Sequence, residues 1–213
     1  MGPVRHRGPE GGHGRVRREA EARVEAPVTV ATKSADFRQE LGVPVRVAHE
    51  VVTSERYLFT LDGSETDPGT MVVSEQEIER RDDGSVYARA VAGKADPEAE
   101  TPPVVMEQVS VISAPGDDGT FTMDSTVPLP KSMGTMRTLQ RFGPADDGGT
   151  LVVTTVTAEV DLPLVGGKIA KQLVAGSEES TARTLRRIEV LVGDSAGDSA
   201  GDSAGDGDAA GRN

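Results

Sequence analysis

One short turn motif occurs three times in the chain, each time as an Asp-Asp-Gly triplet. The copies are Asp82-Asp83-Gly84, Asp117-Asp118-Gly119 and Asp146-Asp147-Gly148. Asp-Gly supplies the positive backbone φ angles that tight turns between antiparallel strands require. Segments rich in β-branched residues flank every copy, and they cover 72–80 and 85–91, 104–112 and 120–127, and 135–142 and 150–160. Three turns and six flanking segments predict three consecutive β-hairpins.

One further strand is expected at 45–52, which is rich in valine, and this gives a meander of about seven strands. Side chains of a strand point alternately to the two faces of the sheet. In the segment after the second turn, the inward set is Phe121, Met123, Ser125 and Val127. The sheet is therefore expected to have one buried face and one solvated face.

The hydrophobic period changes to three and four residues from about Val165, which predicts an amphipathic helix ending near Gly193. Its apolar positions are Val165, Ile169, Leu173, Leu185, Ile188 and Leu191. A helix of about 25 residues spans roughly 38 Å, which is enough to cross a sheet. The sequence thus predicts an α+β fold in which a curved antiparallel sheet of seven strands wraps over one long C-terminal helix.

The apolar face of this helix has a gap between Leu173 and Leu185. The gap holds only small residues, namely Gly176, Ser177, Ser180 and Thr184. A close-packed core would place large apolar residues there. Two interpretations remain open: sheet side chains such as Phe121 and Met123 fill the space, or the space is a cavity for a ligand.

Both ends of the chain lack the apolar residues that a packed core needs. Residues 1–27 are rich in Gly, Arg and Glu, and the segment 28–44 is either a short strand or a linker. The C-terminal end repeats Gly-Asp-Ser-Ala from Gly193, without the ligand spacing of a calcium loop. We therefore expect a disordered or weakly structured region at 1–44, a folded domain at 45–193 and a disordered tail at 194–213.

Composition limits the functional classes. The net charge is −12 and aromatic residues make up 3% of the chain, which opposes binding to nucleic acid or to an anionic membrane surface. There is no cysteine, and no apolar run is long enough to cross a membrane. The N-terminus lacks the apolar segment of a secretory signal, so the cytoplasm is the expected location. The sequence identifies no protein partner.

Catalytic and metal-binding patterns are also missing from the sequence. His6 and His13 lie in the expected disordered region, and only His49 lies in a predicted element. A lone histidine without cysteine cannot form a zinc site of the usual kind. His49 is expected to be a buried, hydrogen-bonded core residue, and a role in ligand contact or proton transfer is the alternative. We expect no cofactor, no metal and no catalytic residue.

The segment 161–171, Asp-Leu-Pro-Leu-Val-Gly-Gly-Lys-Ile-Ala-Lys, resembles the strand-to-helix junction of a bacterial family of START-like proteins, domain of unknown function 2505. The resemblance implies the helix-grip fold, which polyketide cyclases, lipid-transfer START domains and Bet v 1-like proteins share. It also implies short helices after the first strand. Residues 53–61 predict one of them, starting at Ser54, and the turn-rich segment that follows predicts no second one.

Three functions are compatible with these features. The first, implied in part by the resemblance, is non-catalytic binding or carrying of an apolar small molecule or lipid between sheet and helix. The expected ligand-binding residues are Phe121, Met123, Met136, Ile169, Leu173, Gly176, Ser180 and His49. The second is a ligand-free protein-interaction module, and the third is a cyclase-like enzyme in which His49 would act.

Overall fold

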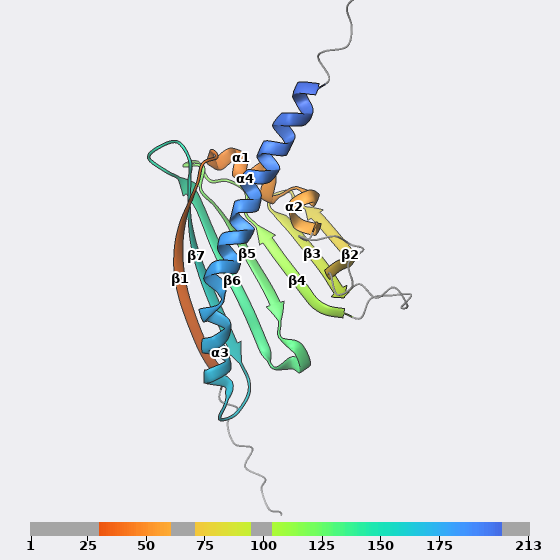
Figure 1. Ribbon diagram of the computed structural model, residues 1–213, viewed down its shortest axis with the longest axis vertical. Coiled ribbons are helices and arrows are strands. Elements are labelled where there is room, and N and C mark those ends of the chain that lie inside the picture. The colour runs from red at the N-terminus through yellow and green to blue at the C-terminus, as the bar shows by residue number, and fades with distance from the viewer. Residues whose placement is uncertain (1–29, 61–70, 95–103, 202–213) are drawn as a thin grey trace, which may run out of the picture.

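The computed structural model describes residues 30–60, 71–94 and 104–201 (Figure 1). Strands, α-helices and one 3-10 turn follow one another as β1 (Ala31–Leu41), α1 (Val45–Val52), α2 (Glu55–Phe59), β2 (Met71–Arg80), β3 (Val86–Lys94), β4 (Val104–Ile112), β5 (Phe121–Pro128), η1 (Pro130–Ser132), β6 (Gly134–Pro144), β7 (Thr150–Val160), α3 (Gly166–Ala175) and α4 (Ser177–Gly201).

All seven strands form one antiparallel sheet in the order β1-β7-β6-β5-β4-β3-β2. Strands β2 to β7 follow one another as neighbours, and β1 joins the far edge by pairing along its whole length with β7. The three predicted hairpin turns are confirmed, because Gly84, Gly119 and Gly148 all adopt positive φ angles of 75° to 86°. Glycine takes this conformation without the steric cost that a Cβ would bring.

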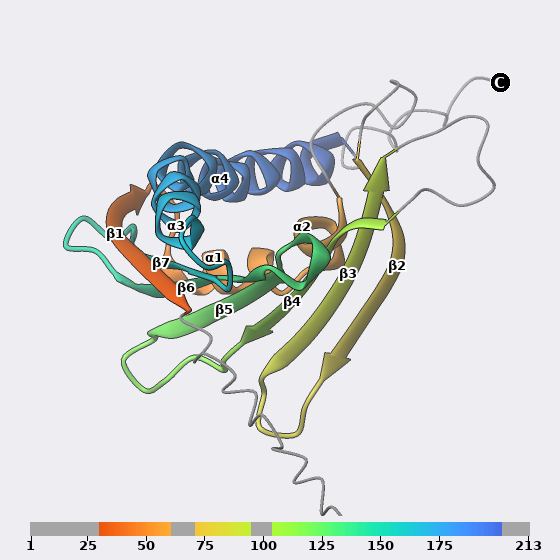
Figure 2. The same cartoon turned by 90° about the horizontal axis from the view of Figure 1, so that it is seen from below.

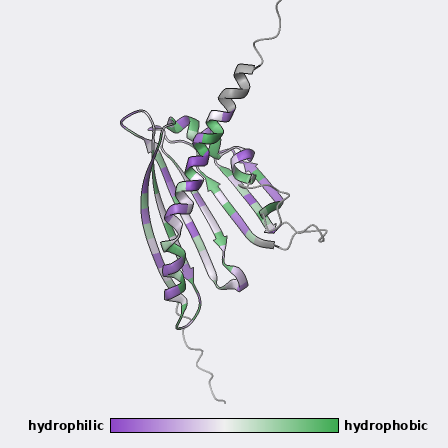
Figure 3. Ribbon diagram, viewed as in Figure 1, coloured by the Kyte–Doolittle hydropathy of each residue, from purple (hydrophilic) through white to green (hydrophobic). Residues whose placement is uncertain are grey.

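The sheet curves around the C-terminal helices, as Figure 2 shows from below. Helices α3 and α4 lie over the concave face, and the β2–β3 half of the sheet bends up beside them. Figure 3 shows polar and apolar residues alternating along the strands and around these helices, which is the pattern of elements with one buried face. This is the helix-grip arrangement that the sequence predicted.

The first strand was misplaced by the sequence analysis. Residues 45–52 form α1, in which Ala48 and Val52 are buried at a four-residue step. Valine is common in strands, but here the burial of residues spaced four apart favours a helix and overrides that preference. The first strand is Ala31–Leu41, within the segment 28–44 that the sequence left open as a short strand or a linker, so the sheet begins before residue 45. Residues 1–29 lie outside the described residues.

Two short helices, not one, follow this first strand. The predicted helix is α2, and its Ser54 hydroxyl accepts a hydrogen bond of 3.2 Å from the Tyr57 backbone N–H, as an N-cap does. Helix α1 precedes it and supplies the second short helix that was not expected. Both lie at one end of the sheet (Figure 1).

The predicted long helix is interrupted once and continues further than expected. Gly176 separates α3 from α4, and α4 ends at Gly201 rather than near Gly193. Gly193 does not take the positive φ angle that commonly ends a helix. The helix therefore runs into the Gly-Asp-Ser-Ala repeat that was assigned to a disordered tail, and residues 202–213 lie outside the described part of the chain.

The junction between β7 and α3 requires a close approach of the backbone. A Cβ on Gly166 would lie 2.9 Å from the Val160 carbonyl oxygen, whereas one on Gly167 would meet nothing within 4 Å. Leu164 adopts a φ of 70° and Val165 is 50% exposed, so Val165 does not belong to the buried face as predicted. The close approach therefore requires a glycine at position 166 but not at position 167, and it lets α3 start directly after β7.

Two separate apolar clusters hold the helices on the sheet. The larger cluster joins α1, α2 and the middle of α4 to the sheet through residues such as Val52, Phe121 and Ile188. The smaller one joins α3 to β1 and β7 through residues such as Ala170 and Val160. The first turns of α4 bridge the distance between the clusters, and this is where the sequence showed its gap of small residues.

Candidate functional site

A cavity of about 430 Å³ lies between the two apolar clusters, under the first turns of α4, and it is partly open to solvent. The sheet, α2 and α4 together form its wall. The lining residues are Tyr57, Leu58, Val73, Ala90, Ala92, Met106, Gln108, Met123, Ser125, Val127, Leu129, Met136, Thr138, Gln140, Ser177, Ser180, Thr181, Thr184 and Arg187. Methionines from three strands contribute flexible apolar surface, which adapts to irregular shapes.

The helical side of the cavity is built from short side chains. Ser177, Ser180, Thr181 and Thr184 all belong to the first two turns of α4. Three of their hydroxyls donate to nearby helix carbonyls: Ser177 donates to Val174 in the last turn of α3 at 2.6 Å, and Ser180 and Thr184 donate to the Ser177 and Ser180 carbonyls of α4, both at 3.0 Å. Because these side chains stay close to the helix, they leave the space below open. An open space therefore remains under α4, and Phe121 does not fill it.

The sheet side carries a row of polar residues across adjacent strands. The register places Thr138 opposite Ser125, and Ser125 opposite Ser110. The Ser110 and Ser125 hydroxyls lie 2.8 Å apart, and the Gln108 amide donates to Ser110 at 3.2 Å. This chain satisfies the buried hydroxyls from within the sheet, as buried polar groups require.

One polar group among the lining residues, the Tyr57 hydroxyl, is buried without a hydrogen-bond partner among the described residues. Gln140 also lines the cavity; the residue is 5% exposed and follows Met136 and Thr138 on the inward face of β6. An unsatisfied polar group in a protein interior is unfavourable unless water or a ligand completes its bonding.

Arg187 lies on the side of the cavity next to Tyr57. Its guanidinium is 5.5 Å from the centre of the Tyr57 ring, and it donates to the Arg56 carbonyl at 2.7 Å. Burial raises the pKa of Tyr57 to about 12, and the nearby Arg187 charge lowers it by a smaller amount. Tyr57 is therefore a neutral phenol at ordinary pH, able to donate a hydrogen bond.

The residues expected to bind a ligand fall into two groups. Met123, Met136 and Ser180 line the cavity. The other five do not: Phe121 is stacked on Phe142 in the larger cluster, Ile169 and Leu173 pack in the smaller cluster, Gly176 is exposed at the helix break, and His49 lies in α1. Ile169 and Leu173 miss the cavity because α3 covers the β1–β7 edge, whereas the cavity lies under α4.

His49 has a structural position. Its Nε2 lies 3.2 Å from the Ser113 carbonyl oxygen, and its ring meets the Phe121 ring edge-on at 4.8 Å. Partial burial lowers the pKa of His49, an effect that the hydrogen bond to Ser113 opposes. These contacts hold α1 against the end of β4, and His49 is not one of the residues that line the cavity.

Sequence reasoning missed Tyr57, Gln140 and Arg187 as cavity residues. Gln140 shared the inward alternation of Met136 and Phe142 in the segment 135–142, so its place in the strand was predictable, although its polar side chain drew no attention. Tyr57 and Arg187 meet through the packing of α2 against α4, and no spacing in the sequence connects residues so far apart.

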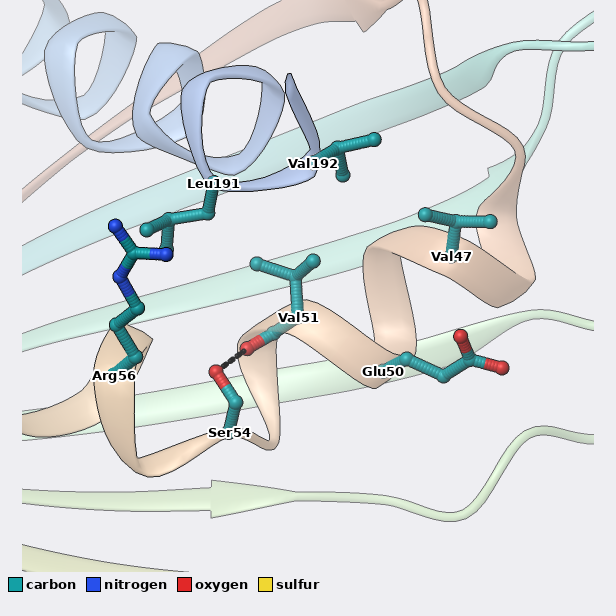
Figure 4. Close-up of a pocket in the computed structure, with 7 residues that line it drawn as sticks. All are labelled: Val47, Glu50, Val51, Ser54, Arg56, Leu191 and Val192. Atoms are coloured by element: carbon teal, nitrogen blue, oxygen red, sulfur yellow. Dashed lines mark hydrogen bonds between the residues drawn. The ribbon is translucent and has the colours of Figure 1, made fainter. Parts of the chain in front are cut away.

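A second, smaller groove of about 340 Å³ lies on the outer side of α1 and α2, where the later part of α4 passes them (Figure 4). Its lining residues are Val47, Glu50, Val51, Ser54, Arg56, Leu191 and Val192. The Ser54 hydroxyl donates to the Val51 carbonyl at 2.7 Å, and Arg56 pairs with Asp194 at 2.8 Å. The first contact lies between α1 and the start of α2, and the Arg56–Asp194 pair links α2 to α4.

No group of three or more His, Cys, Asp or Glu side chains that could hold a metal ion is found within residues 30–60, 71–94 and 104–201. In the same part of the chain, none of the helices combines the length and the apolar character needed to span a lipid bilayer.

Comparison with known proteins gives a family and several structural likenesses. No curated protein sequence matches the chain. Solved structures with similar backbones include a protein of unknown function from Staphylococcus aureus (13% identity, TM-score 0.49, covering 78% of this chain and 98% of that one). Another is a START superfamily protein from Mycobacterium smegmatis (17% identity, TM-score 0.46, covering 74% of this chain and 98% of that one). A third is truncated norcoclaurine synthase from Thalictrum flavum (14% identity, TM-score 0.47, covering 78% of this chain and 97% of that one).

The family model described as "Protein of unknown function (DUF2505)" matches residues 36–189. The match starts within β1 and ends within α4, so it includes part of β1, all of β2 to β7, and every lining residue of the cavity. The resemblance seen at the β7–α3 junction is thereby confirmed over most of the chain, and the protein belongs to the DUF2505 family.

Proposed function

We propose that the protein binds or carries an apolar small molecule or lipid in the cavity between the sheet and α4. The observation that carries this proposal is the cavity itself, a space of about 430 Å³ left between two packed clusters. Small-molecule sites typically have volumes of about 300–1,000 Å³ and largely apolar walls. Nine of the nineteen lining residues are Met, Val, Leu or Ala.

The local design of α4 supports this proposal. Protein interiors are packed as densely as organic crystals, so an empty space under a helix loses contacts that larger side chains would supply. The helix provides large buried residues at Leu185 and Ile188, whereas its first two turns above the cavity present small hydroxyl residues. An open space is retained at a cost in stability, which is expected where the space has a use.

The proposed role is binding without chemical conversion. Among the described lining residues, Tyr57 and Arg187 are the ionisable ones, and the raised pKa of Tyr57 keeps its hydroxyl protonated. A general acid or base works best with a pKa near the operating pH. His49, which the cyclase-like alternative would use, is bonded to Ser113 outside the wall. These features favour a carrier over an enzyme.

The test compares the same substitution on the two faces of the sheet. Val127 lines the cavity, whereas Val111 is exposed on the opposite face of the neighbouring strand. The uncharged fluorophore N-phenyl-1-naphthylamine serves as the probe for the full-length protein. We expect saturable one-to-one binding, a dissociation constant raised at least tenfold in Val127→Phe, and no change in Val111→Phe. Native mass spectrometry of the purified protein should also detect a co-purified small molecule.

A folded protein that binds neither the probe nor any co-purified compound would refute the proposal and leave the protein-interaction alternative. Equal weakening by both substitutions would show that the probe binds elsewhere. Recovery of a bound compound in chemically altered form after incubation would favour the cyclase-like alternative.

A further inference from the structure

Two exposed apolar side chains lie next to each other in the connection between β7 and α3. Leu164 has a relative exposure of 105%, Val165 is half exposed, and the φ of Leu164 is 70°. A leucine in this left-handed conformation is strained, whereas glycine or asparagine adopts it readily. The fold therefore gives no reason for a leucine at position 164, because its backbone is unfavourable and its side chain buries no surface.

The start of β1 and the end of the η1 turn lie beside this connection. Val30 directly precedes β1 and is also half exposed. A Cβ on Gly166 would lie 3.3 Å from the Ala31 Cβ, which places the start of β1 against the start of α3. The Asp161 N–H donates to the Met133 carbonyl at 2.8 Å, which holds the chain after η1 beside the connection. Three segments far apart in the sequence thus meet at one end of the molecule, the lower end in Figure 1.

Lysines surround the exposed apolar residues. Four of the five lysines of the chain lie on β1, η1 and α3 at this end, namely Lys33, Lys131, Lys168 and Lys171. All four are exposed, and none of them forms an ion pair with a described residue. Within residues 30–33, 128–134 and 159–171 the acidic residues are Glu159 and Asp161, so lysines outnumber acids two to one.

The opposite end of the sheet is acidic. Successive connections of an antiparallel meander alternate between the two ends, so the three Asp-Asp-Gly turns share one end, whereas η1 and the β7–α3 connection share the other. Those turns contain six aspartates. The net charge of −12, which opposes attraction of the chain as a whole to an anionic surface, is therefore unevenly distributed, and one end combines lysines with projecting apolar side chains.

We infer that Val30, Leu164, Val165 and the four lysines form a patch that docks on an anionic lipid bilayer. The apolar side chains enter the headgroup layer, and the lysines pair with lipid phosphates. Binding at a lipid interface depends on buried apolar area together with attraction of basic residues to anionic lipids. Three apolar side chains are few for a protein interface of about 800 Å² per partner, but they suffice for insertion among headgroups.

This inference goes beyond the proposed function and does not depend on it. The two are spatially compatible, because Leu129 lines the cavity and lies only two residues from Lys131. Docking through the patch places the bilayer next to the end of the cavity that Leu129 forms.

Flotation of the full-length protein with lipid vesicles tests the inference. One set of vesicles contains phosphatidylcholine alone, and the other contains phosphatidylcholine and phosphatidylglycerol in equal amounts. We expect the protein to float with the mixed vesicles, to bind them at least tenfold more tightly than the neutral ones, and to be released as the salt concentration rises.

A substitution at position 164 separates binding from folding. Leu164→Asn removes the apolar side chain and suits the left-handed backbone, so the free energy of unfolding should stay the same or rise. Binding to the mixed vesicles should weaken at least tenfold, as expected when a leucine is no longer withdrawn from water. Val190→Asn is the control, since Val190 is exposed on the part of α4 that passes α1, and it should bind as the wild type does.

A pair of charge reversals tests the lysines in the same way. Lys168→Glu with Lys171→Glu should abolish flotation with the mixed vesicles. The double variant Arg183→Glu with Arg186→Glu is matched to it, because both pairs are exposed, lie three residues apart on a helix and change the net charge equally. It should retain nearly all of the binding, since α4 lies outside the patch.

A wild-type protein that does not float with the mixed vesicles would overturn the inference, as would equal weakening by the matched variants. A wild-type dimer that Leu164→Asn dissociates would also overturn it, because the patch would then join two copies of the chain. Binding of N-phenyl-1-naphthylamine, measured on the same samples, should be the same in Leu164→Asn and wild type. Failure of flotation with intact probe binding therefore leaves the proposed function standing, and failure of probe binding alone leaves this inference standing.

Discussion

Replacing Thr181 with leucine would fill part of the cavity from the helical side. Thr181 is 8% exposed, it lines the cavity, and its hydroxyl makes no hydrogen bond to the described residues. The change adds two carbon atoms and removes a hydroxyl. At about 0.8 kcal/mol per buried methylene, and allowing for incomplete burial, the free energy of unfolding should rise by about 1 kcal/mol. For a domain of this size that corresponds to an increase in Tm of about 2–4 °C.

The same substitution should weaken ligand binding. The added carbons occupy the space that the ligand needs, so we expect the dissociation constant for N-phenyl-1-naphthylamine to rise about tenfold, which is roughly 1.4 kcal/mol. Urea unfolding and probe titration measure the two effects on the same sample. Thr181→Val is the control, because it removes the hydroxyl but keeps the shape of the side chain, and it should leave binding nearly unchanged.

Opposite signs of the two effects are the signature of a cavity that is kept open for use. A destabilised Thr181→Leu protein with unchanged probe binding would refute the reasoning, because it would mean that leucine meets packed protein atoms and that the probe binds elsewhere. A stabilised protein with unchanged binding would show that there is space under α4 but that it is not where the probe binds.

Three further predictions concern the backbone and two titrating groups. Gly134→Ala should lower the free energy of unfolding by about 3 kcal/mol or more, since its Cβ would lie 1.9 Å from the Glu159 carbonyl oxygen. Gly148→Ala is the control: its Cβ would meet nothing within 4 Å, so it should lower the free energy of unfolding by only about 1–2 kcal/mol, because of the positive φ. Burial lowers the pKa of His49, so the unfolded chain takes up this proton first, and stability should fall as the pH drops from 6.5 through the folded-state pKa. His49→Gln should reduce that slope. Burial raises the pKa of Tyr57 from 10.0 to about 12, so between these pH values the unfolded chain loses the proton and the folded protein keeps it. The free energy of unfolding should therefore fall as the pH rises through this range, and Tyr57→Phe should remove that fall.

Urea unfolding curves at several pH values measure all three. Equal destabilisation by the two glycine substitutions would contradict the close approach at Gly134. A slope that His49→Gln leaves unchanged would mean that other groups titrate in that window. If absorbance titration of the protein shows Tyr57 ionising near pH 10, the burial of its hydroxyl is wrong.

Local features of the sequence predicted much of the sheet. The Asp-Asp-Gly turns determine their own backbone conformation through glycine, so six strands and their pairing were predictable. The segment 45–52 was not, because its valines suit a strand as well as a helix face, and the packing of Ala48 and Val52 against the sheet decides between them. β1 was ambiguous for a related reason: it becomes a strand by pairing with β7, more than a hundred residues away.

The candidate site divides in the same way. The sequence by itself determined that the middle of the C-terminal helix has small side chains, because residue size and helical period are local properties. It could not determine where that face lies, since the break at Gly176 turns α3 onto the β1–β7 edge and leaves α4 over the centre of the sheet. Tertiary structure alone brought Tyr57, Gln140 and Arg187 to one wall, because contacts between distant segments depend on how the sheet curves and not on any spacing along the chain.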